Sequence, residues 1–228
     1  KVNIAPGTKS ATFDLTVSLR SVQVTPATAV PGQAITLSGD GYTKNGTIAI
    51  NGITMKAGTV TTQANVNAAA VSIDSTGSWS LATTMPTLDT TSGNGISSTI
   101  VFTATDSATV PLIGKSDTSF KRTAKAVTLS PTTINPGEAL TVTVAGFTVD
   151  SITTDTTAAE FTVTMRTAAA GGGDAVTLTG TSTFPINSDG TGTGTVTVPT
   201  TVTAGTRYIT VTDNAGSVGT GASSNNFW

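Results

Sequence analysis

The sequence contains no cysteine and no histidine among its 228 residues. Without cysteine the chain has no disulfide and no thiolate nucleophile. Without histidine it lacks the usual general base near neutral pH and the commonest transition-metal ligand. Only two glutamates accompany the aspartates, and both lie in the second half of the chain. We therefore predict that the protein is not an enzyme.

Charges and long apolar runs are also scarce. Charged residues make up 11% of the chain, the formal net charge is −2, and the Lys and Arg residues are scattered along it. A chain of this kind has no electrostatic field that would attract nucleic acid, so we expect no nucleic-acid partner. No run of about 18 apolar residues is present, which predicts that no segment spans a membrane.

Threonine is the abundant residue, with 52 copies. It is β-branched and fits the half-buried surface of a sheet better than a helix. Alternation of apolar residues with threonine predicts strands at Leu140–Val144, Phe161–Met165, Thr195–Val198 and Ile209–Val211. Tight turns are predicted at Asp40-Gly41, Asn45-Gly46, Asn51-Gly52 and Asp189-Gly190. The fold class predicted is all-β, with strands packed as sandwiches.

The sequence repeats itself with an interval of 107 residues, measured between Phe13, Phe120 and Phe227. Other landmarks keep nearly the same spacing: Val22–Pro26 matches Val127–Pro131, Pro31-Gly32 matches Pro136-Gly137, Gly41-Tyr42 matches Gly146-Phe147, and Asp106 matches Asp213. An interval of this length suits one small domain.

We therefore predict a leading strand over residues 1–12, a first module over 13–123 and a second module over 124–228. The connection from Phe120 to Ala126 contains neither proline nor glycine. Because such a connection has little freedom, we expect a stiff joint between the modules.

This succession of motifs resembles the immunoglobulin-like repeats of bacterial and archaeal cell-surface proteins, most closely the plexin-and-transcription-factor type. The resemblance covers nearly the whole chain, twice. It implies tandem immunoglobulin-like β-sandwich domains at the cell surface, in an S-layer, a stalk or a filament. It implies that in each module the Pro-Gly pair forms the first turn, and that Gly41 and Gly146 let a strand cross between sheets. Where the first module has Trp79, the second has glycine, so that core position must be filled differently.

Residues 1–17 allow two interpretations. In an excised array, residues 1–17 are the last strand of a preceding module. In a mature subunit, the same segment can act as a donor strand that completes the sandwich of the next copy and so builds a filament. The side chains that would serve such assembly are Val2, Ile4, Phe13, Leu15 and Val17. The partners expected are copies of the chain or neighbouring modules.

Other site predictions concern metal, sugar and glycans. Hard oxygen ligands are available from Asp74, Asp106, Asp189 and Asp213, so Ca²⁺ is the one metal we consider. The sequence contains no complete calcium loop, and turn-forming aspartate is the simpler explanation. No other cofactor is expected. Asn45 lies in the only Asn-x-Ser/Thr sequence and is a candidate glycosylation site. An adhesin or carbohydrate-binding module remains the third alternative, because Tyr and Trp side chains can stack on sugars.

From these patterns we expect a non-enzymatic structural protein that is located outside the cell.

Overall fold

The computed structural model describes residues 20–57, 64–86, 100–117, 119–149, 159–168 and 172–214, and the backbone of 218–227. These residues form strands and turns and contain no helix. The predicted all-β class is confirmed. The leading strand and its residues Val2, Ile4, Phe13, Leu15 and Val17 lie outside the described part of the chain.

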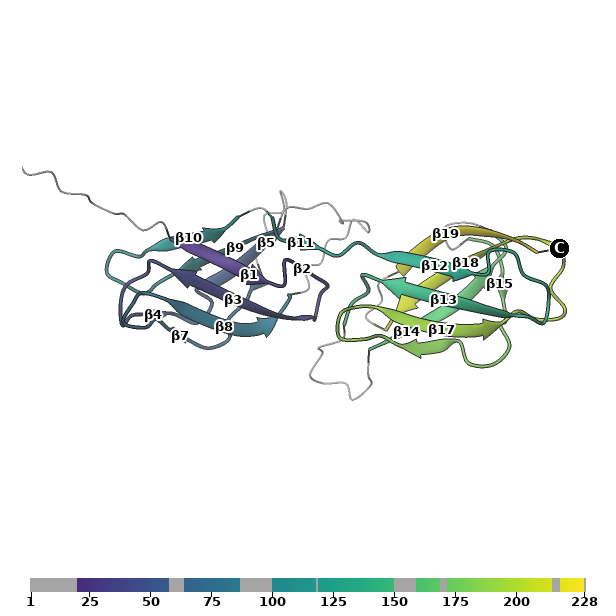
Figure 1. Cartoon of the computed structure of the whole chain (residues 1–228), viewed down its shortest axis with the longest axis horizontal. Coiled ribbons are helices and arrows are strands. Elements are labelled where there is room, and N and C mark those ends of the chain that lie inside the picture. The colour runs from purple at the N-terminus through teal and green to yellow at the C-terminus, as the bar shows by residue number, and fades with distance from the viewer. Residues whose placement is uncertain are drawn as a thin grey trace, which may run out of the picture.

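The strands form two groups (Figure 1). The first group, which we call the first sandwich, comprises β1 (Ser21–Thr25), β2 (Thr28–Ala29), β3 (Ala34–Asp40), β4 (Thr47–Ile48), β5 (Ile53–Ala57), β6 (Ala64–Asn65), β7 (Val71–Ser72), β8 (Trp79–Thr84), β9 (Ile100–Thr105), β10 (Ile113–Ser116) and β11 (Lys121–Arg122). The second sandwich comprises β12 (Ala126–Ser130), β13 (Ala139–Ala145), β14 (Glu160–Arg166), β15 (Ala175–Val176), β16 (Thr183–Pro185), β17 (Gly192–Thr197), β18 (Gly205–Asp213) and β19 (Val218–Phe227).

In the first sandwich the main strands pair in the order β6-β5-β9-β10-β1-β3-β8. All pairs in this path are antiparallel except β10 with β1, which is parallel and two residues long. This short pairing joins the β1-β3-β8 layer to the β10-β9-β5-β6 layer. Side chains from both layers meet in one core that includes Leu37, Trp79 and Phe102.

In the second sandwich the two layers are separate sheets. One has the order β12-β13-β17, and the other has the order β15-β14-β18-β19 with β16 also paired to β14. The alternation noted in the sequence places Leu140, Val142 and Val144 of β13 in the core, where they meet Phe161 and Met165 of β14. Threonines of these strands lie between the buried positions, as period-2 alternation requires.

In each sandwich a glycine on another strand makes room for one large aromatic side chain. In the first sandwich the Trp79 indole lies over Gly39, where a Cβ atom would come within 2.6 Å of Nε1. In the second, Phe184 of β16 lies over Gly194 of β17, where a Cβ atom would come within 2.3 Å of the Phe184 ring. Phe184 also packs against Phe161, with ring centroids 5.5 Å apart. At Gly192, the position equivalent to Trp79, a Cβ atom would come within 2.8 Å of the Phe161 ring, so the space of the missing tryptophan is occupied by Phe161 from another strand.

The predicted turns have the expected backbone. Asn45 and Asn51 adopt positive φ angles of 56° and 62°, and Gly41 and Gly146 have φ of 82° and 76°. The two sandwiches lie end to end along the long axis of the molecule (Figure 1). The fold is a tandem pair of immunoglobulin-like β-sandwiches. The predicted boundaries at 12/13 and 123/124 stay predictions.

Candidate functional site: the joint between the sandwiches

The chain passes from one sandwich to the next while still hydrogen-bonded to the first. β11 pairs in parallel with β2, and the N–H groups of Lys121 and Thr123 donate to the carbonyl oxygens of Ala27 and Ala29 at 3.2 and 3.0 Å. β12 begins at Ala126, only three residues after Thr123. The connection is therefore short and held at its first half.

A second contact across the joint comes from the turn that precedes β3. The Val149 N–H of the second sandwich donates to the Pro31 carbonyl oxygen at 2.9 Å. Val30 is fully buried, and the Gly190 backbone packs against it so closely that a Cβ atom there would come within 2.7 Å of Val30. The joint thus combines a backbone hydrogen bond with a buried apolar side chain.

Gly32 is the tightest point of this joint. Its φ of +82° favours glycine, and a Cβ atom built on it would lie 1.7 Å from the Val149 carbonyl oxygen. Because the obstacle is backbone, a side chain at position 32 cannot be accommodated unless the two sandwiches move apart. A glycine that the sequence motif explains as a turn residue is also required by the approach of the second sandwich.

Charged groups surround the same contact. Asp213 is buried, and its Oδ2 accepts a hydrogen bond from the Thr148 N–H at 3.1 Å, which holds the segment next to Val149. Burial lowers the pKa of both Arg122 and Lys125, and the negative charge of Asp213 opposes that effect for each of them. The Lys125 Nζ also lies 5.4 Å from the centre of the Phe147 ring, a distance suited to a cation–π contact.

The four aspartates proposed as calcium ligands occupy two kinds of position. Asp106 and Asp213 are buried and accept backbone hydrogen bonds from Thr43 and Thr148 at equivalent places in the two sandwiches. Asp74 and Asp189 are exposed, and each accepts hydrogen bonds from residues two positions further along. No group of three or more His, Cys, Asp or Glu side chains suited to a metal ion occurs among the described residues. The calcium site stays a prediction.

Asn45, the candidate glycosylation site, is exposed on the loop that connects β3 to β4. Its own N–H donates to the Asp74 carbonyl oxygen at 2.9 Å, so the backbone is held while the side chain faces solvent. Modification at this position stays a prediction.

Two aromatic residues considered for sugar stacking are in the core. Tyr42 and Trp79 are both 4% exposed and pack edge to face, with ring centroids 5.8 Å apart. Neither ring offers a face to a ligand from solution.

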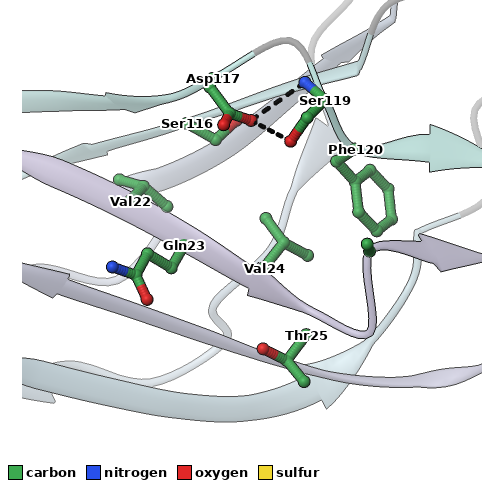
Figure 2. A pocket seen from close by; sticks show the side chains of 9 residues that line it. Val22, Gln23, Val24, Thr25, Ser116, Asp117, Ser119 and Phe120 are labelled. Atoms are coloured by element: carbon green, nitrogen blue, oxygen red, sulfur yellow. Dashed lines mark hydrogen bonds between the residues drawn. The ribbon is translucent and has the colours of Figure 1, made fainter.

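The first sandwich also contains a groove of about 240 Å³ between β1 and the segment that follows β10 (Figure 2). Val24 and Phe120 lie at its apolar side, and Asp117 accepts hydrogen bonds from the backbone and hydroxyl of Ser119 at its polar rim. The groove exists because the β1–β10 pairing ends at Val22 and Ser116 and the β2–β11 pairing begins only at Thr28.

The short connection predicts a stiff joint, but sequence reasoning missed the contact of Val30–Gly32 with the second sandwich, although the repeats contain a signal for it. The position of Val30 is Asn135 in the second repeat, and the position of Val149 is Lys44 in the first. Apolar residues therefore stand where the sandwiches meet, and polar residues stand at the equivalent outer ends.

Comparison with known proteins gives resemblances in structure only. No protein-family model matches the sequence. No curated protein matches it. The chain is similar to a tetra-tandem repeat from the extending region of a large adhesion protein (18% identity, 92% of this chain and 48% of that chain, TM-score 0.31). It is also similar to the D0-D1 domain of intimin (16% identity, 92% and 94%, TM-score 0.26).

A third similar structure is the N-terminal part of the bacterial S-layer protein SbsC (13% identity, 92% of this chain and 44% of that chain, TM-score 0.25). The chain thus spans about half the length of the adhesion-protein and S-layer structures. Among the described residues, no helix is long and apolar enough to cross a membrane.

Proposed function

We propose that this chain is a non-enzymatic structural protein of an extracellular layer, stalk or filament, in which a stiff joint keeps successive immunoglobulin-like sandwiches in line. The observation that supports this proposal most directly is the joint itself. The Val149 N–H bonds to Pro31, Val30 is fully buried, and Gly32 has no room for a side chain. A flexible linker between independent binding domains would require none of these contacts.

The experiment measures the distance between the two sandwiches in solution. Because the sequence lacks cysteine, Ser80→Cys and Thr193→Cys place one spin label on an exposed strand position of each sandwich. Pulsed electron–electron double resonance should give a narrow distribution of distances between the two labels. A broad distribution in the parent chain would contradict the proposal.

Gly32→Ala tests which contact makes the joint stiff. We expect this change to broaden the distance distribution, because the new Cβ atom would collide with the Val149 carbonyl oxygen. Gly137→Ala is the matched control. It lies in the equivalent turn with φ of +89°, close to the +82° of Gly32, but its Cβ atom would meet only the Thr200 methyl group at 3.2 Å. The control should leave the distribution narrow.

The alternative is a filament in which residues 1–17 act as a donor strand, and it requires an open strand edge in a sandwich of the next copy. Each sandwich already has a closing strand, β10 in the first and β19 in the second. The groove of Figure 2 leaves only three residues of β1 open, Gln23 to Thr25, which is short for a whole strand. Donor-strand exchange therefore requires β10 or β19 to leave its place. Electron microscopy of the chain with and without residues 1–17 tests this alternative.

A further inference from the structure

The turn that forms the joint occurs a second time, at the outer end of the second sandwich. In the joint turn the Gly32 N–H donates to the Met85 carbonyl oxygen, and the Met85 N–H donates to that of Gln33. The Gln33 N–H donates to the Val30 carbonyl oxygen. In the second copy the equivalent Gly137, Glu138 and Val198 make the same three backbone hydrogen bonds, with Val198, Asn135 and Glu138 as acceptors. Even the side-chain cap is shared: Gln33 Oε1 accepts from the Val30 N–H, and Glu138 Oε2 accepts from the Asn135 N–H.

The two turns share these hydrogen bonds but differ in what covers them. Pro31 and Gly32 are buried beneath the second sandwich, whereas Pro136 is half-buried and Gly137 is exposed. We call residues 135–138 the outer turn. Its backbone has the shape that receives a sandwich in the joint.

The surface that contacts the joint turn is also present twice. In the second sandwich it is the segment Phe147–Val149, which Asp213 holds through the Thr148 N–H. In the first sandwich the equivalent segment is Tyr42–Lys44, and the Asp106 Oδ2 accepts from the Thr43 N–H at 3.0 Å in the same way. β3 runs from the joint turn to this segment, so Tyr42–Lys44 lies at the end of the first sandwich that is remote from the joint (Figure 1).

Exposed apolar side chains gather at that same end. Ile50, Val110 and Ile113 are 59%, 76% and 53% exposed. Ile50 lies on the β4–β5 loop, Val110 lies on the β9–β10 loop, and Ile113 begins β10. The Ser107 N–H donates to the Thr47 carbonyl oxygen at 2.8 Å, and Ile113 pairs with Thr105 across the β9–β10 hairpin. Docking of a second copy at this end would remove part of this apolar surface from water.

We propose that the outer turn of one copy docks on the Tyr42–Lys44 segment of a second copy, head to tail, in the geometry of the internal joint. Charge supports a second copy as the partner. In the internal joint Val30 is buried against Gly190 and the Val149 N–H bonds to Pro31. At the outer ends the exposed carboxylate of Glu138 lies next to Gly137, and the receiving segment carries the exposed ammonium of Lys44. The contact joins two different surfaces, so it does not close and extends into a filament. This inference rests on the proposed function, since it takes the internal joint as the repeating contact.

Sedimentation velocity of the whole chain at low ionic strength tests the proposal. The weight-average mass should rise with protein concentration and fall as salt is added. Gly137→Ala should abolish the rise, because the equivalent Cβ at position 32 would lie 1.7 Å from backbone. The control is Gly180→Ala, which places alanine at a similar φ of +86° with nothing within 4 Å, and it should associate like the parent.

Charge reversal at Lys44 provides a second test, because it leaves the outer turn and its Glu138 cap unchanged. Lys44→Glu should weaken association about two- to fivefold, in line with a solvent-exposed ion pair, whereas Lys44→Arg keeps the charge and should associate like the parent. Lys56→Glu makes the same charge change at an exposed position of β5 and controls for net charge. An equal loss in Lys44→Glu and Lys56→Glu would overturn the proposal.

Two further outcomes distinguish docking through the outer turn from donor-strand exchange and from the proposed function. Persistence of association in a chain lacking residues 1–17 supports docking through the outer turn, and its loss there would overturn it in favour of a donor strand. A narrow inter-label distance in a chain that stays monomeric at all concentrations would overturn docking while leaving the proposed function intact.

Discussion

Tyr42 and Phe147 occupy equivalent places in the two sandwiches and differ by one hydroxyl group. The Tyr42 hydroxyl is buried without a hydrogen-bond partner, and Gly114 makes room for it, since a Cβ atom there would lie 2.1 Å from the oxygen. Burial raises the pKa of Tyr42 to about 12. Because the phenol ionises near pH 10 in the unfolded chain and only near 12 in the folded one, its titration leaves stability intact below pH 10 and lowers it as the pH rises through about 12.

We predict that Tyr42→Phe leaves the free energy of unfolding at pH 7 unchanged or raises it by about 1 kcal/mol, because it removes a buried hydroxyl that has no partner. The variant should also lose less stability than the parent between pH 10 and pH 12. Urea unfolding followed by Trp79 fluorescence measures both effects, in a Trp228→Phe background so that one tryptophan reports. A loss of more than about 1 kcal/mol at pH 7 would show that the hydroxyl is bonded.

At the scale of elements, Asp106 connects two loops at the outer end of the first sandwich. Its Oδ2 accepts from the Thr43 N–H, and its Oδ1 accepts from the Leu112 N–H at 2.8 Å and from the Ala108 N–H at 3.3 Å. Burial alone would raise the pKa of Asp106, but the hydrogen bonds from Leu112 and Thr43 outweigh it and place the pKa below 3.8. The carboxylate therefore stabilises the fold above that pH, and the contribution is lost as the pH falls below it.

We predict that Asp106→Asn lowers the free energy of unfolding by about 1 to 3 kcal/mol at pH 7 and that its difference from the parent shrinks below pH 4. Chemical unfolding over a pH series measures this. Asp117→Asn serves as the control, because Asp117 is exposed and its hydrogen bonds within the described residues come from Ser119, two positions along the chain. An equal effect of the two changes would mean that the loop connection has no special role.

Strands and turns could be predicted from the sequence because they depend on local patterns. The alternation from Leu140 to Val144 became β13, and the Asn45 turn took the positive φ that asparagine tolerates. The stiff joint followed from the short connection, but the contact of Val30–Gly32 with the second sandwich could not be predicted in this way. The repeat pattern shows what the two sandwiches share, whereas a contact between them depends on where they differ, as Val30 differs from Asn135. Likewise, Phe161 of β14 packs over Gly192 of β17, the position of Trp79, and these strands belong to different sheets that only the fold brings together.

At the scale of the whole molecule, the two cores are separate but share the joint. Phe120 is 2% exposed and packs edge to face on Phe102, with ring centroids 5.5 Å apart, so the segment between β10 and β11 is anchored in the first core. Phe161 is fully buried in the second core. Val30 belongs to the first sandwich, yet its burial depends on Gly190 of the second. Unfolding of one sandwich must therefore expose part of the other.

We predict that Phe120→Ala destabilises the first sandwich by about 3 to 5 kcal/mol, because it removes a buried aromatic side chain and leaves a cavity. Differential scanning calorimetry should show one transition moving strongly to lower temperature. The other should move only slightly, through the loss of its neighbour at the joint. Phe161→Ala is the matched change and should reverse the pattern. Both variants could instead lower the temperature of one single transition by the same amount. That result would contradict the prediction, because it would mean that the joint makes the two sandwiches unfold as one cooperative unit.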